Sequence, residues 1–111
     1  MTLSTHVLDA TYGRPAAGVA VRLEAAADDG WKSLAETATG EDGRAREGLA
    51  AALSAGRHRL VFDTAGYFAA QGVEEFFFPE VAICFTVADP DAHYHVPLLL
   101  SPFAYSTYRG S

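Results

Sequence analysis

Apolar and polar residues alternate along most of this chain, in short runs separated by turn-forming residues. The clearest run has Val19, Val21 and Leu23 in alternation with less apolar neighbours. Because successive side chains of a β-strand point to opposite faces, a period of two indicates strands with one buried face. Several such strands in one short chain predict an all-β fold, a sandwich of two packed sheets.

Glycine, proline and aspartate mark the ends of the runs, for example in Asp28-Asp29-Gly30 and Glu41-Asp42-Gly43. The expected strands between these turns are residues 3–9, 19–24, 31–38, 44–46, 57–63, 81–87, 93–100 and 105–109. The turn 12–15 ends the first of them.

Two segments break the alternation. Thr64 is expected to cap a short helix over residues 64–71, which Gly72 ends. The alanine-rich residues 50–55 have helical composition but are too short and uniform to place. Without a repeat, low-complexity tract or linker, residues 1–111 are expected to form a single domain.

Composition excludes several classes of function. With 8 basic against 14 acidic residues, the net charge of −6 argues against binding nucleic acid or an anionic membrane. No apolar run approaches the roughly 20 residues needed to span a bilayer. The first residues lack a secretory pattern and the last lack a peroxisomal one, so the expected location is cytoplasmic. The single cysteine, Cys84, excludes an internal disulfide and is expected to be a buried, inert thiol.

Histidines are the main candidate reactive groups. His93 and His95 share one face of their strand with Pro97 and Leu99, and the other face is apolar too. A strand that is apolar on both sides is expected to be buried on both, here by the core and by another subunit. His6 taken alone is more typical of a structural histidine, although His6, His93 and His95 together could bind a metal. Spacing gives them no acidic partner, so a metal-free site is preferred.

Other polar residues are ambiguous by spacing alone. Arg44 follows a tight turn, where most arginines are simply solvated. The segment 105–111 is rich in hydroxyl and aromatic groups, yet a chain end is commonly a frayed edge strand.

Three stretches together resemble the 5-hydroxyisourate hydrolases of the transthyretin-like family. The opening Leu-Ser-Thr-His-Val-Leu-Asp (3–9), followed by Gly-Arg-Pro-Ala (13–16), is similar to their N-terminal signature. The stretch His-Tyr-His-Val-Pro-Leu-Leu-Leu-Ser-Pro (93–102) resembles their penultimate strand. The ending Tyr-Ser-Thr-Tyr-Arg-Gly-Ser (105–111) resembles their C-terminal motif, which hormone-binding transthyretins lack.

The resemblance implies a transthyretin-like sandwich of eight strands in two sheets with one short helix. It also implies a homotetramer with active sites at subunit interfaces, and hydrolysis of 5-hydroxyisourate in urate breakdown without a cofactor or metal. The catalytic residues it implies are His6, Arg44, His95 and Ser111, with Tyr108, Arg109 and Gly110 as substrate contacts or parts of the cleft wall.

These residue types suit the reaction. A neutral imidazole, with an ordinary pKa near 6.5, can take a proton from water near neutrality. An arginine fork can hold a urate-like ring and stabilise a developing oxyanion, and a terminal serine offers a hydroxyl and a carboxylate. Which histidine is the general base stays open. The alternatives are a non-enzymatic, transthyretin-like carrier of a small ligand and a metal-dependent hydrolase.

Overall fold

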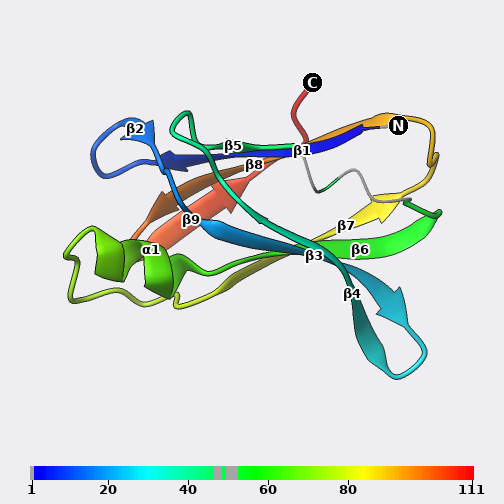
Figure 1. The fold of residues 1–111 in the computed structure, drawn as a ribbon, viewed down its shortest axis with the longest axis horizontal. Helices are drawn as coiled ribbons and strands as arrows, with labels where there is room; N and C mark the ends of the chain where they lie inside the picture. The colour runs from blue at the N-terminus through cyan, green and yellow to red at the C-terminus, as the bar shows by residue number, and fades with distance from the viewer. Residues whose placement is uncertain (1, 47–48, 50–52) are drawn as a thin grey trace.

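The fold is a sandwich of two sheets with one helix at its side (Figure 1). The structure is a computed structural model and describes residues 2–46, 49 and 53–111. Its strands are β1 (Thr2–Asp9), β2 (Arg14–Pro15), β3 (Ala20–Ala27), β4 (Gly30–Ala38), β5 (Arg44–Ala45), β6 (Gly56–Phe62), β7 (Val81–Val87), β8 (His93–Ser101) and β9 (Ala104–Thr107), and the helix α1 spans Thr64–Ala70.

The first sheet joins the two ends of the chain. Its order is β2-β1-β8-β9, and β5 pairs with β1 beside β2. The β1–β8 pairing is parallel, and every other pairing in this sheet is antiparallel. The parallel register sets Ser4 beside His95 and His6 beside Pro97. The two histidine-bearing stretches of the sequence therefore meet on neighbouring strands.

The second sheet has the order β4-β3-β6-β7 and is antiparallel throughout. It forms the other layer of the sandwich, from which the β3–β4 hairpin projects (Figure 1). A register shift between Leu23 and Glu24 marks a bulge in β3, which bends the strand locally.

The core lies between the sheets, where the predicted alternation is confirmed. Val19, Val21 and Leu23 are buried, and so are Leu60 and Phe62 of β6, the strand paired with β3 in the same sheet. Burying each such side chain contributes about 1.5–3 kcal/mol relative to leaving it in water. The same alternation in β1 and β8 leaves one face of the first sheet directed away from the core.

Helix α1 begins differently from the prediction. The N-cap is Asp63, whose carboxylate accepts a hydrogen bond from the Gly66 N–H at 3.0 Å. Thr64 is instead buried and donates its hydroxyl to the Phe78 carbonyl at 2.5 Å. The carboxylate one residue earlier reaches the free N–H groups of the first turn, so Thr64 is released for this buried bond.

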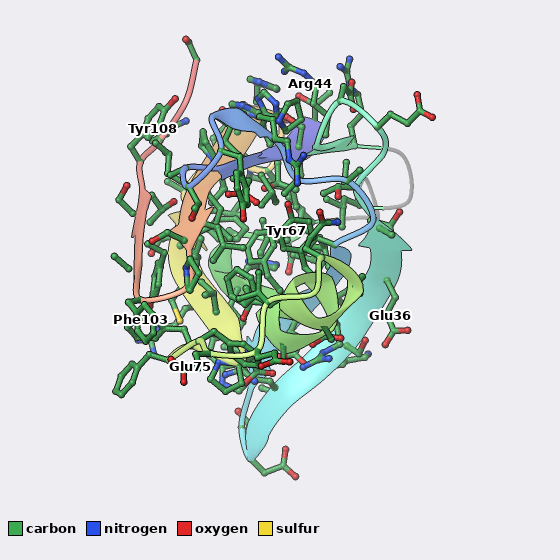
Figure 2. All side chains as sticks on the ribbon, turned by 90° about the vertical axis from the view of Figure 1, so that its left-hand side faces the viewer. Glu36, Arg44, Tyr67, Glu75, Phe103 and Tyr108 are labelled. Carbon is green, nitrogen blue, oxygen red and sulfur yellow. The ribbon has the colours of Figure 1, made fainter. Side chains whose placement is uncertain are left out.

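A buried hydrogen bond joins the helix to the first sheet. The Tyr67 hydroxyl donates to the Asp9 carboxylate at 2.7 Å, well inside the molecule (Figure 2). Burial first, and then the bond to Asp9, raise the pKa of Tyr67 to about 12. The helix therefore anchors the far end of the strand that carries His6.

The expected burial of Cys84 is wrong. Val81, Ile83 and Val87 of β7 face the core, so Cys84, at the opposite parity, is exposed. Its apolar sequence neighbours suggested burial, but the alternation of the strand decides which side it faces.

Three boundaries also differ or stay open. Arg14 and Pro15, expected in a turn, form the short strand β2 against the end of β1. The last strand ends at Thr107, after which Gly110 alone bridges to His95. Of the alanine-rich segment 50–55, residues 50–52 lie outside the described residues. No helix in the described part of the chain is long and apolar enough to cross a membrane.

Candidate active site

The outer face of the first sheet brings three of the predicted residues together. β5 pairs with β1 so that His6 lies opposite Arg44, and β8 runs along the other side of β1 with His95 beside Ser4. Ser4, His6 and His95 are all half-buried on the side away from the core. The strand face assigned to His95 from the sequence is therefore confirmed. The fourth histidine, His58, lies in the core on the second sheet.

His6 is held by the turn before β5. Its Nε2 lies 2.9 Å from the backbone oxygen of Asp42. A carbonyl oxygen can only accept, so this partner assigns the proton of the neutral ring to Nε2 and the lone pair to Nδ1. The Asp42 carboxylate also accepts from the backbone N–H of Arg44 at 3.0 Å and lies 3.9 Å from the Arg44 Nε. One turn thus orients both His6 and Arg44.

Gly43 makes this close approach possible. It has φ of +77° and its carbonyl accepts from the Val7 N–H at 2.8 Å. A Cβ at this position would overlap the Val7 carbonyl. Only glycine adopts this conformation readily and leaves room for the strand beside it.

His95 is held on two sides of its ring. The Ser4 hydroxyl lies 2.7 Å from Nδ1. On another edge, Gly110 packs so closely against Cδ2 that a Cβ there would overlap the ring. Burial lowers the pKa of His95, and the charge of Arg44 and the two other histidines on this face lower it further. The ring is therefore neutral near neutral pH.

The C-terminal segment completes a cavity above this face. The Gly110 N–H donates to the His95 carbonyl at 2.8 Å, and the chain end leaves the molecule on the outer side of the first sheet (Figure 1). A cavity of about 320 Å³ is lined by residues that include Arg44, Arg46, His93, His95 and Ser111. Three of the four catalytic residues implied by the resemblance thus share one cavity. The fourth, His6, lies opposite Arg44 in the β1–β5 strand pairing but does not line the cavity.

Tyr108 and Arg109 lie on the other side of His95. A second cavity, also of about 320 Å³, is lined by both of them together with Cys84 and His95. The Arg109 guanidinium lies 5.0 Å from the centre of the Tyr94 ring. Tyr108 and Arg44 point outward at the same end of the molecule (Figure 2). Within one chain, His95 therefore separates the Tyr108 side from the Arg44 side.

Three supporting residues were not singled out as functional by the sequence: Ser4, Asp42 and Gly43. Ser4 shares strand parity with His6, which was the available signal, but parity does not show which residue of a distant strand lies beside it. Asp42 binds His6 through its backbone carbonyl. Every residue type has this group, so the sequence does not indicate the contact.

A metal site receives no geometric support in the described part of the chain. There, no group of three or more histidine, cysteine, aspartate or glutamate side chains lies close enough to hold a metal ion. His93 instead pairs with the Thr2 hydroxyl through Nδ1, and its ring stacks against that of His95 with centroids 6.4 Å apart.

The two-sheet sandwich and its histidine–arginine face define a transthyretin-like protein. The sequence model of the HIUase/Transthyretin family matches residues 3–110. The chain belongs to this family, as the resemblance in its sequence predicted.

Known relatives include both 5-hydroxyisourate hydrolases and transthyretins. A 5-hydroxyisourate hydrolase of Caulobacter vibrioides is 46% identical over 98% of this chain and 97% of its own length. One from Salmonella typhimurium is 44% identical over 98% of this chain and 80% of its own length. The solved 5-hydroxyisourate hydrolase of Klebsiella pneumoniae has a TM-score of 0.86 at 41% identity, with both chains fully covered. Transthyretin from Sparus aurata has a TM-score of 0.88 at 33% identity, over 97% of this chain and 95% of its own. The fold is therefore common to both kinds of protein, and the site must separate them.

Proposed function

We propose that this protein hydrolyses 5-hydroxyisourate and opens its oxidised purine ring in urate breakdown. The observation that carries the proposal is the meeting of Arg44, His95 and Ser111 at one cavity, beside a His6 that pairs with Arg44. Relatives named for this activity, at 40–46% identity over nearly the whole chain, support it.

The proposed reaction is attack of water on a ring carbonyl. An imidazole takes a proton from water, the oxygen bonds to the carbonyl carbon, and the C=O electron pair moves to its oxygen. Collapse re-forms C=O and breaks the C–N bond, and the imidazole pair returns the proton to the departing nitrogen. The net change is addition of one water. Positioned proton transfer of this kind contributes about 10²- to 10⁴-fold.

His6 and His95 are the proposed acid/base pair. The Nε2–H of His6 donates a hydrogen bond to the Asp42 carbonyl, so Nδ1 is its basic nitrogen. The lowered pKa of His95 keeps that ring neutral and ready to exchange a proton. Arg44 carries a fixed positive charge and a planar fork, which suits it to hold the ring and stabilise the oxyanion.

The tail residues are proposed to shape and close the site. Ser111 lines the cavity beside His95 and Arg44, and is proposed to orient a histidine or the attacking water. Gly110 positions Ser111 in the cavity, because glycine has no side chain and its backbone can lie against the His95 imidazole. Tyr108 and Arg109 are proposed to contact substrate from the other side of His95.

A homotetramer with sites at its subunit interfaces is part of the proposal. Exposed aromatic side chains near the β9 edge and the Phe77 loop support an association surface, since Phe77 is 70% and Phe103 65% exposed. Light scattering is expected to give about four times the 11.8 kDa chain mass. A monodisperse, fully active monomer would contradict this. A cytoplasmic location and a single domain stay predictions.

A small-ligand carrier is the alternative, because the fold matches carriers equally well. Sea bream transthyretin, solved in complex with thyroxine, has a TM-score of 0.87. The histidine, arginine and tail set favours the enzyme instead. The deciding experiment follows the ultraviolet decay of freshly generated 5-hydroxyisourate with and without the protein, since a carrier would not accelerate it.

A further inference from the structure

Parallel pairing of β1 and β8 gives each histidine of β8 its own hydroxyl group on β1. The register places Thr2 beside His93 and Ser4 beside His95. In both pairs the hydroxyl oxygen contacts Nδ1 of the imidazole. The strand contact thus repeats the same hydroxyl–imidazole pair two residues apart.

The Ser4–His95 pair differs from the other in its surroundings. The Ser4 bond is 2.7 Å long and partly buried, whereas the Thr2–His93 pair is exposed. His95 is also confined by Gly110 against Cδ2 and by the stacked ring of His93. With Nδ1 engaged and Cδ2 covered, Nε2 is the ring nitrogen left to exchange a proton with a molecule in the cavity.

A histidine that transfers protons needs a fixed tautomer, because a neutral ring has one protonated and one basic nitrogen. A partner that can only accept, such as a carbonyl, sets the tautomer by itself, whereas a hydroxyl can either donate or accept. For His6 that partner is the Asp42 carbonyl. For His95 it is the Ser4 hydroxyl, the hydrogen-bond partner of its ring nitrogens within the described residues.

We propose that Ser4 is the positioning residue of His95: its hydroxyl oxygen accepts a hydrogen bond from Nδ1–H, which holds the ring in one tautomer and leaves Nε2 as the basic nitrogen for the reaction. This inference rests on the proposed hydrolysis and deepens it. Ser4 lines the same cavity as His95, and its proposed role is to act through the His95 ring. Its loss should therefore affect turnover more than binding.

The test compares Ser4→Ala with Ser4→Thr, which keeps the hydroxyl, and with Thr2→Val, which removes the matching hydroxyl from His93. Ser4→Ala is expected to lower kcat about tenfold, the worth of one hydrogen bond, with KM nearly unchanged. Ser4→Thr should restore most of the loss, and Thr2→Val should leave kcat close to wild type. Wild-type kcat in Ser4→Ala, or an equal loss in Thr2→Val, would overturn the proposal.

A second measurement reads the ring without any activity. Two-bond ¹H–¹⁵N correlation spectra of the unmodified protein should show one tautomer of His95, and both tautomers in Ser4→Ala. Two populated tautomers in the wild type would overturn the proposal even if Ser4→Ala failed to fold. A single tautomer of His95 without any acceleration of 5-hydroxyisourate decay would contradict the proposed function. It would still support the positioning of the His95 ring by Ser4.

Discussion

Gly110 lies directly against the imidazole of His95 and donates its N–H to the His95 carbonyl at 2.8 Å. The contact joins the C-terminal segment to the strand that carries a proposed catalytic histidine. Because Ser111 follows immediately, the same contact determines where the last residue lies in the cavity.

Gly110→Ala is expected to lower turnover by about 10²-fold, since its methyl group would displace either the ring or the chain end. Ser106→Ala is the control, because Ser106 is exposed on β9 near the same chain end and lines neither cavity beside His95. Steady-state kinetics and thermal unfolding of both variants check the prediction. Equal activities in the two would show that the contact does not matter to the reaction.

Extension of the chain beyond Ser111 should also be damaging. Ser111 lines the cavity with Arg44 and His95, so added residues place bulk at its opening. A C-terminal tag, or deletion of residues 109–111, is expected to cripple activity while circular dichroism stays unchanged. A tag on the N-terminus should do less harm. Full activity of the C-terminally tagged protein would contradict the proposed role of Ser111 in the site.

Replacing His6 or His95 by alanine should reduce kcat roughly 10²- to 10⁴-fold, the usual worth of positioned proton transfer. His93→Ala is the control, because His93 stacks on His95 from the same strand but is exposed and paired with Thr2. It should retain most of the activity. The opposite pattern, with His93 essential and His95 dispensable, would reverse the assignment.

Most of the fold followed from strand alternation and turn residues, as Val19, Val21 and Leu23 illustrate. Alternation determines faces but not partners, so the Ser4–His95 pair depended on the parallel register between strands about 90 residues apart in sequence. The observed N-cap of α1 is one residue before the predicted one, because Asp63 and Thr64 are both good capping residues. The catalytic set itself came from the resemblance, since spacing alone favoured a structural role for His6 and a solvated surface position for Arg44.

The pKa of His95 is expected to lie below the ordinary 6.5, because burial and then the Arg44 charge disfavour the protonated ring. Arg44→Gln should raise it by removing that charge. Since the pKa is lowered in the folded state, this group costs stability as pH falls through the ordinary value, and activity should fall at acidic pH. NMR titration of the His95 ring provides the measurement. A midpoint at or above 6.5 in the wild type would contradict the burial and charge argument.

The proposed hydrolysis of 5-hydroxyisourate needs no metal. The direct measurement is the ultraviolet decay of freshly generated 5-hydroxyisourate, recorded with the protein, without it, and with the protein after treatment with EDTA. We expect decay well above the spontaneous rate, unchanged by EDTA and lost in His95→Ala. Decay at the spontaneous rate with the wild-type protein would contradict the account and favour the carrier, and activity abolished by EDTA would favour a metal-dependent hydrolase.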